Sequence, residues 1–124
     1  MGLTFDTGAL IAIERSDLRM LKVLDTSLSG RVAITVPTAV VGEWWRARSR
    51  RLSSILAMFT VEPLSERLAR LAGEAIAAVP GATLVDAVVM ASAAERGDVV
   101  YTSDEQDLIR LRDGRFPTTR VLRV

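Results

Sequence analysis

Short apolar runs alternate along the chain with longer stretches whose apolar residues recur at helical spacing. Five runs are rich in β-branched and aromatic residues and predict strands, at 3–5, 31–36, 59–64, 98–102 and 120–124. The stretches between them predict helices, at 9–14, 18–28, 38–58 (continuous or restarting near 52), 65–78, 83–96 and 103–111. Strands that alternate with helices favour an α/β domain with a mainly parallel sheet.

Small polar residues predict where the helices begin. Asp6 or Thr7 is expected to cap the first helix, and Thr38 the helix that carries Glu43. In the helix over 18–28, one face carries apolar residues, namely Leu18, Leu21, Leu24 and Leu28. These assignments fix which polar residues come directly after a strand.

Four acids from distant segments are predicted to lie at one edge of the sheet. In an open parallel sheet, ligands bind beyond the carboxyl ends of the strands. Asp6 directly follows the first strand, and Asp104 follows the fourth strand by two residues. Glu43 lies early in the helix that leaves the second strand, and Asp86 opens the helix that leads back into the fourth. If the strands are parallel, all four reach the carboxyl edge.

Each acid also has a structural explanation of its own. Asp6 could serve simply as a helix cap, without any functional role. Asp86 could complete a capping box with Thr83. Asp104 can stabilise the positive end of a helix, and Glu43 can be one solvated residue on a helix face. A shared site is favoured because all four fall on the ligand edge of the same sheet.

The composition limits the chemistry of such a site. The chain has 124 residues, a length that fits one domain over 1–124, and it contains neither cysteine nor histidine. Thiolate and imidazole ligands are therefore excluded, and clustered carboxylates, which repel one another, suit Mg²⁺ or Mn²⁺. Such an ion can activate water and stabilise the charge that develops when a phosphodiester is displaced.

The remaining features concern location and overall charge. The net charge is only +1, so a nucleic-acid surface has to be local. No segment is long and apolar enough to span a membrane, and the start lacks a signal-peptide pattern. We expect a cytoplasmic protein with no membrane partner.

Four motifs resemble those of the PIN-domain ribonucleases. TFDTGALIA with Asp6 is similar to the first motif of that family and VVGEWWR with Glu43 to the second. LVDAVVMASAAERG with Asp86 is similar to the third, and VVYTSDEQDL with Thr102 and Asp104 resembles the fourth. The order and spacing hold over nearly the whole chain. Each motif is weak alone, but all four in order are fairly specific, and they most resemble the VapC toxins.

This resemblance implies a PIN-like three-layer sandwich, with a short, mainly parallel sheet between helices on both faces. It implies that the four acids carry one or two Mg²⁺ or Mn²⁺ ions and a nucleophilic water. Thr7 and Thr102 would then position a metal-bound water or a phosphate, and Asp107 would be an outer acid. VapC toxins cut RNA, often tRNA, as homodimers, and a cognate VapB antitoxin silences them.

Two features differ from the family pattern. Many VapC-like chains place two helices between the second acid and the third strand, whereas here only residues 44–58 are available, enough for one helix or a short pair. That reduction affects the substrate and antitoxin regions more than the metal site. Met90 stands where small or branched apolar residues are common, and we expect the core to tolerate it.

Basic and aromatic residues follow Glu43. A candidate RNA-contacting ridge, or alternatively a solvated helix face, is formed by Arg46, Arg48, Arg50 and Arg51. Further candidates for phosphate contacts are Arg15, Arg19 and Lys22. Trp44 and Trp45 are adjacent on a helix, so one is expected in the core and the other exposed.

Other functions fit the sequence less well than the nuclease. A haloacid-dehalogenase-type phosphatase needs an acid two residues after Asp6, where Gly8 stands, and a receiver domain needs a late lysine, whereas the only lysine is Lys22. The alternatives from other classes are a catalytically silent PIN-like domain that binds RNA or protein, and a purely structural α/β domain. Metal binding that depends on Asp6 distinguishes the nuclease from both.

Overall fold

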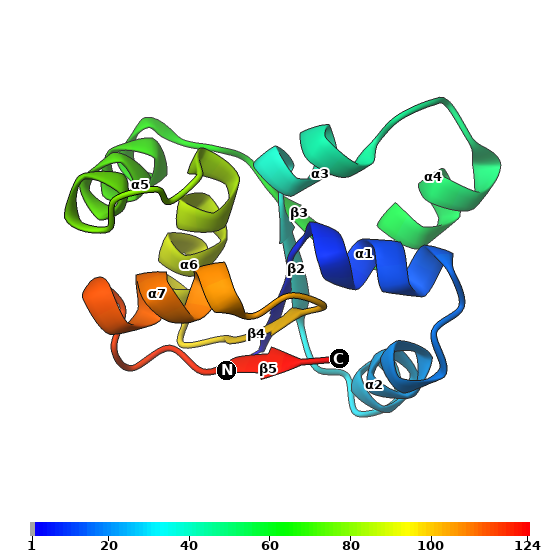
Figure 1. The fold of residues 1–124 in the computed structure, drawn as a ribbon. Helices are drawn as coiled ribbons and strands as arrows, with labels where there is room; N and C mark the ends of the chain where they lie inside the picture. Colours follow the sequence, from blue (N-terminus) through cyan, green and yellow to red (C-terminus); the bar gives the residue numbers. More distant parts are fainter. Residues whose placement is uncertain (1) are drawn as a thin grey trace.

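The computed structural model describes residues 2–124 as one sheet between two groups of helices (Figure 1). The strands are β1 (Leu3–Phe5), β2 (Ile34–Pro37), β3 (Thr60–Glu62), β4 (Val99–Thr102) and β5 (Val121–Arg123). The helices are α1 (Thr7–Glu14), α2 (Leu18–Ser29), α3 (Thr38–Trp44), α4 (Arg50–Leu56), α5 (Glu66–Ala78), α6 (Leu84–Arg96) and α7 (Gln106–Gly114).

Every strand pairing in the described chain is parallel, in the order β3-β2-β1-β4-β5. Helices α1, α2 and α4 lie on one side of the sheet and α5, α6 and α7 on the other, while α3 contacts both α1 and α6 (Figure 1). The predicted α/β class and its three layers are therefore confirmed. Because the strands are parallel, their carboxyl ends share one edge.

The central strands and helix α6 are apolar because they are buried in the core of the protein. Strands β1 and β2 are buried on both faces, as is usual when helices cover a parallel sheet. The Phe5 ring is fully buried and meets the rings of Phe59 and Tyr101 edge to face. Helix α6 is buried from Ala87 to Ala93 between the sheet, α5 and α7. Met90 belongs to this buried stretch, so the core accommodates it as expected.

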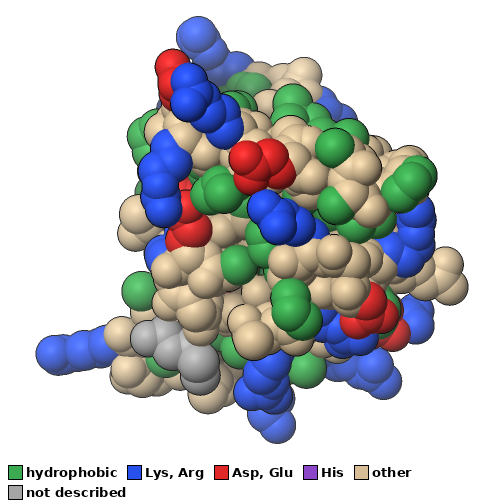
Figure 2. All heavy atoms as spheres, turned by 90° about the vertical axis from the view of Figure 1, so that its left-hand side faces the viewer, with side chains coloured by type: hydrophobic (Ala, Val, Ile, Leu, Met, Phe, Trp, Pro, Cys, Tyr) green, Lys and Arg blue, Asp and Glu red, His purple; other side chains and the backbone are tan. Residues whose placement is uncertain are grey.

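The outer surface of α5 and α7 carries acidic and basic side chains that alternate with apolar ones (Figure 2). Arg70 pairs with Glu66 along α5, and Arg115 reaches Glu74 from the end of α7. Exposed pairs of this kind contribute little to stability. No helix within residues 2–124 is long and apolar enough to cross a membrane.

Three local predictions were wrong. Thr38 does not cap α3, because Pro37 precedes the helix and the Thr38 hydroxyl accepts a hydrogen bond from Leu64 N at 3.1 Å. The second strand begins at Ile34 rather than Arg31. The helix expected over 103–111 lies at 106–114, because Thr102 holds the intervening turn through hydrogen bonds to the backbone of Asp104.

The buried face of α2 coincides only in part with its apolar face. Leu24 is buried and Leu21 packs against the core, but Leu18 is 82% exposed and Leu28 is exposed as well. The fully buried residues are Met20, Leu24 and Ser27, which follow a helical stripe rotated from the apolar one. Both stripes have helical periodicity, and only the position of the neighbouring α1 decides which one is covered.

Between the end of α3 and β3 the chain forms one short helix, α4, which begins at Arg50 and is capped by Ser49. Trp44 is fully buried, and its Nε1 donates to Glu14 Oε1 at 3.1 Å. Trp45 is half-buried and meets the Trp44 ring edge to face, so it is less exposed than expected. The short segment therefore keeps its aromatic residues in contact with the core.

Candidate functional site

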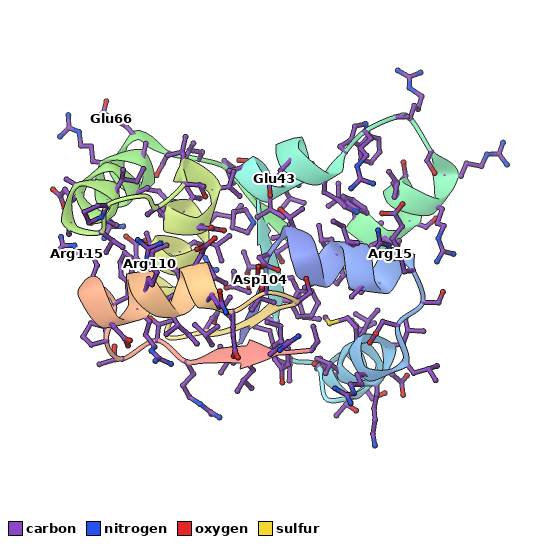
Figure 3. The ribbon with its side chains drawn as sticks, in the orientation of Figure 1. Arg15, Glu43, Glu66, Asp104, Arg110 and Arg115 are labelled. Carbon is purple, nitrogen blue, oxygen red and sulfur yellow. The ribbon has the colours of Figure 1, made fainter. Side chains whose placement is uncertain are left out.

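A cleft of about 150 Å³ opens at the carboxyl ends of β1 and β4. It is lined by all four predicted acids, both predicted threonines and Asp107, with Gly8 and Ser103 between them; the full set is Asp6, Thr7, Gly8, Glu43, Asp86, Thr102, Ser103, Asp104 and Asp107. The order of the elements thus brings together the acids that the sequence singled out. Glu43, near the end of α3, and Asp104, in the turn after β4, both line the cleft (Figure 3).

Asp6 is the most buried of these acids, with 8% of its surface exposed. It follows β1 directly and caps α1, since its Oδ1 accepts from Ala9 N at 2.9 Å. Burial raises the pKa of Asp6 to about 6, and the charges of Asp86 and Glu43 add to the increase, while polar contacts with Thr102 and Ala9 N oppose it. Capping therefore does not account for the whole environment of this carboxylate.

Asp86 stands in the first turn of α6 and is half-buried. Its backbone N donates to Thr83 Oγ1 at 3.2 Å, so the capping explanation is correct for the threonine. Burial raises the pKa of Asp86, the contact with Thr83 lowers it, and the charges of Asp107, Glu43 and Asp104 raise it further. The carboxylates are therefore close enough to act on one another.

Glu43 lies at the end of α3 with an exposed side chain. The Thr7 hydroxyl donates a hydrogen bond to Glu43 Oε1. Because Thr7 is the first residue of α1, this bond joins two helices that leave neighbouring strands. Thr7 thereby helps to position the exposed Glu43 carboxylate at the cleft.

Thr102 and Asp104 form a turn at the end of β4. The buried Thr102 hydroxyl donates to the Asp104 carbonyl oxygen at 2.9 Å and accepts from Asp104 N at 3.1 Å. The Asp104 Oδ1 accepts from Gln106 N at 3.3 Å, and its side chain is exposed. Asp107, in the first turn of α7, pairs with Arg110 at 3.6 Å, and both are exposed.

The donor chemistry of the cleft suits a hard divalent cation. Every charged lining group is a carboxylate, and the raised pKa values of Asp6 and Asp86 show that their negative charges are destabilised. A divalent cation would relieve that repulsion. Within residues 2–124, however, no three acidic side chains stand at the spacing of a preformed metal centre. The side chains of Glu43 and Asp104 are exposed to solvent, although both line the cleft.

Gly8 and Ser103 are the lining residues that the sequence did not reveal. A Cβ atom at Gly8 would lie 2.2 Å from Ser103 Oγ and 3.1 Å from Ser103 N. Helix α1 and the end of β4 can approach this closely only because residue 8 has no side chain. In the sequence, the only sign that Gly8 and Ser103 line the cleft is that they lie close to the predicted acids Asp6 and Asp104.

The predicted arginine ridge does not line the cleft. The side chains are all exposed at Arg46, Arg48, Arg50 and Arg51. Arg51 is held at the end of α1, where its NH2 donates to Glu14 O at 2.6 Å and Ser16 Oγ at 3.3 Å. Arg51 therefore contacts the end of α1 that lies away from the acids.

One further buried acid lies at the opposite edge of the sheet. Asp98 precedes β4, and it accepts hydrogen bonds from Gly2 N, the Thr4 hydroxyl and Arg96 Nε, each at 2.9 Å. Arg96 also pairs with Glu62 at 2.6 Å. These partners satisfy Asp98, so it is a structural acid at the amino ends of the strands.

Sequence comparison and structure comparison give different results. No protein-family model and no curated protein matches this chain. Solved structures do match. A chain of the VapBC2 complex from Rickettsia felis bound to promoter DNA has a TM-score of 0.75 at 13% identity, with 100% of this chain and 99% of that chain covered.

Two further structures have the same fold. A chain of DNA-bound VapBC from Salmonella typhimurium has a TM-score of 0.72 at 16% identity, covering 99% of this chain and 98% of that one. VapC20 from Mycobacterium tuberculosis, a toxin that cleaves the sarcin–ricin loop, has a TM-score of 0.66 at 18% identity, covering 86% and 92%. The chain therefore has the fold of VapC toxin structures, as the PIN-domain resemblance implied.

Proposed function

We propose that this protein is a metal-dependent endoribonuclease that hydrolyses RNA phosphodiester bonds. The observation that carries the proposal is the cleft into which four sequence-distant acids converge, with the charge of each of Asp86 and Glu43 raising the pKa of Asp6. The VapC-like fold supports the same function, because one of the similar structures is an RNA-cleaving toxin.

Mg²⁺ or Mn²⁺ is the proposed cofactor. Asp6 and Asp86, the two partly or fully buried acids, would hold it, with Glu43 and Asp104 completing the set of oxygen ligands. When bound, such an ion supplies Lewis acidity and activates a water for in-line attack on phosphorus.

The protein's own residues prepare this cleft in three ways. Thr7 holds Glu43 by a hydrogen bond, which limits the orientations that the exposed carboxylate can take. Thr102 fixes the backbone of Asp104 from both sides. Burial leaves Asp6 with a pKa of about 6, so near neutral pH it is mostly ionised and ready to accept a cation.

We further propose that the protein is the toxin of a VapBC-type pair. VapBC complexes are among the similar structures, which supports a VapB-like antitoxin that covers the cleft. An RNA substrate of the class that includes tRNA, a homodimeric assembly and a cytoplasmic location complete the proposal. Its alternative is a silent PIN-like module that binds RNA or protein without cutting it.

Cleavage of mixed tRNA and structured RNA in Mg²⁺ or Mn²⁺ tests the proposal. Asp6→Asn and Asp86→Asn are each expected to reduce the rate at least about a hundredfold, because each removes a charged group from the reacting site. Asp25→Asn is the matched control, since Asp25 is exposed on α2 and lies outside the cleft. EDTA should abolish cleavage by the wild type.

The outcomes separate the two functions. Cleavage that needs metal, persists in Asp25→Asn and disappears in both cleft variants supports the nuclease. Cleavage that both cleft variants retain contradicts it, because a contaminating nuclease would then be the source. A folded wild type that binds RNA or an antitoxin but cuts no RNA favours the silent module.

A further inference from the structure

A second pocket adjoins the acidic cleft. Its volume is about 260 Å³, and it is lined by Gly8, Ile11, Ala12, Arg15, Asp17, Ser103 and Val124. It shares Gly8 and Ser103 with the acidic cleft, so the two hollows meet at the close approach of α1 to the end of β4. A chain that occupies the acidic cleft can therefore extend into this pocket without leaving the surface.

The direction of this extension follows helix α1. Thr7 begins α1 in the acidic cleft, and Arg15 directly follows its last residue. At 1.5 Å per residue, this places the Arg15 backbone about 12 Å from that of Thr7 along the helix axis. Arg15 accordingly lies at the end of α1 remote from Glu43 and Asp104 (Figure 3).

Arg15 differs from the other basic residues near α1. Its side chain is exposed and forms no ion pair with the residues that the structure describes. Arg51, by contrast, is engaged with the Glu14 carbonyl oxygen and Ser16. Of the residues that line the acidic cleft and the second pocket, Arg15 is thus the one with a positively charged side chain.

The other lining groups complement a nucleoside. Ile11 and Ala12 offer an apolar wall from the exposed side of α1, which suits the face of a base or sugar. Ser103 contributes a hydroxyl at the junction with the acidic cleft. Asp17 contributes a carboxylate whose Oδ1 accepts from Met20 N, which leaves Oδ2 as an acceptor for a hydroxyl or amino group.

The geometry points to a nucleoside-binding subsite: the pocket takes a nucleoside of the RNA strand beside the bond that is cut, and Arg15 contacts the phosphate attached to it. This inference rests on the proposed nuclease function and deepens it. Arg15 positions the strand, because a phosphate contact fixes register without reading sequence, whereas the Ile11 wall contacts the nucleoside itself. The two residues should therefore affect cleavage differently.

The first test compares Arg15→Ala with Arg120→Ala, a matched control on an exposed arginine outside both hollows. With a fluorescent single-stranded RNA substrate, Arg15→Ala should raise KM about tenfold and leave kcat nearly unchanged, since the contact is made in both ground and transition states. Arg15→Lys should recover most of the loss, because it keeps the charge.

Binding of the same RNA in EDTA gives a second readout. The slope of log K against log salt should decrease in magnitude by about 0.7 in Arg15→Ala, the value for one phosphate contact on a single strand. The slope should be unchanged in Arg120→Ala and in Arg15→Lys. A purely structural role for Arg15 would not change this slope.

The third test concerns the nucleoside. The wild type and Ile11→Ala cut an RNA pool that is randomised around the cleavage site, and the cut ends are sequenced. Ile11→Ala should change the nucleotide preference at one position next to the cut, while Ile76→Ala, a half-buried control on α5, should not. Melting temperatures identify any variant that fails to fold.

These results distinguish the subsite from the nuclease itself. If the wild type cuts RNA but Arg15→Ala and Ile11→Ala behave like their controls, the subsite is wrong and the nuclease stands. If the folded wild type neither cuts nor binds RNA, both proposals fall. A raised KM with a reduced salt slope in Arg15→Ala, together with a changed preference in Ile11→Ala, supports the subsite.

Discussion

The Thr7 hydroxyl donates a hydrogen bond to the Glu43 carboxylate, which joins the start of α1 to the end of α3. Glu43 is exposed, so without this bond its side chain can take several rotamers. The bond therefore favours one orientation of the Glu43 side chain, which the helix alone does not fix.

Thr7→Val should separate this effect from folding. The variant keeps the shape of the side chain but loses the donor of a bond that is exposed to solvent, so its net contribution to stability is small. We expect the melting temperature to change by a few degrees at most, while RNA cleavage slows by about tenfold, because Glu43 is no longer held toward the cleft. Thr7→Ser keeps the hydroxyl and should cut at nearly the wild-type rate; equal rates in Thr7→Val and the wild type would contradict the role of Thr7.

Asp6 should make the stability of the protein depend on pH. Its pKa is about 6 in the folded protein against 3.8 ordinarily. Below about pH 4 the group is protonated in both the folded and the unfolded state. Between about pH 4 and 6 the unfolded chain releases the proton while the folded protein retains it, so stability is lost over this range, and the loss is complete once the folded carboxyl group also ionises. Because a tenfold change in an equilibrium is about 1.4 kcal/mol, the loss by pH 7.5 is up to about 3 kcal/mol.

Asp6→Asn tests this directly, because asparagine also caps helices. In urea unfolding with EDTA present, the variant should be more stable than the wild type at pH 7.5 and should approach it at pH 4. Asp25→Asn, on an exposed residue, should match the wild type at both pH values. A variant that is less stable at pH 7.5 would show that the carboxylate stabilises the fold instead.

Addition of Mn²⁺ should raise the melting temperature by several degrees at pH 7.5. A ligand that binds only the folded state stabilises it in proportion to the logarithm of its concentration above Kd. The increase should be smaller at pH 5, because Asp6 must lose a proton before it can hold the ion. Scanning calorimetry checks both values.

The metal effect has matched variants. Asp6→Asn and Asp86→Asn should lose the Mn²⁺-dependent increase, and Asp25→Asn should keep it. An increase of the same size in all three variants would mean that Mn²⁺ binds outside the cleft, and the proposed ligands would then be incorrect.

The convergence of the acids was predictable because it depends on chain order. Asp6 comes after β1 and Asp98 comes before β4, and in a parallel sheet this alone sends them to opposite edges. The α/β alternation therefore identified which acids could meet. It also predicted the boundaries of β1 and α6 closely, because a turn residue or a cap marks each of them.

Features that depend on tertiary contacts were not predictable in this way. Leu18 and Met20 lie on competing stripes of α2, and the contact with α1 decides that Met20 is buried. Thr38 has the side chain of a cap, but β3 ends nearby, and the hydroxyl accepts from Leu64 N instead. The arginine ridge likewise could not be placed from sequence alone, and none of its four arginines lines the cleft.

Gly8→Ala should damage the protein although alanine favours helices. Its Cβ would lie 2.2 Å from Ser103 Oγ and 3.1 Å from Ser103 N, so the hydroxyl must rotate away and the backbone must shift beside Asp104. Overpacking of this kind costs about 1–3 kcal/mol, which outweighs the gain of about 0.5–1 kcal/mol from replacing a helical glycine. Gly73→Ala on α5 meets nothing within 4 Å and should show only the gain.

We therefore expect Gly8→Ala to lower the melting temperature and RNA cleavage together, and the addition of Ser103→Ala to restore part of both. Equal stability of Gly8→Ala and Gly73→Ala would mean that α1 and the end of β4 can separate without cost, and the junction between the two hollows would then not be rigid.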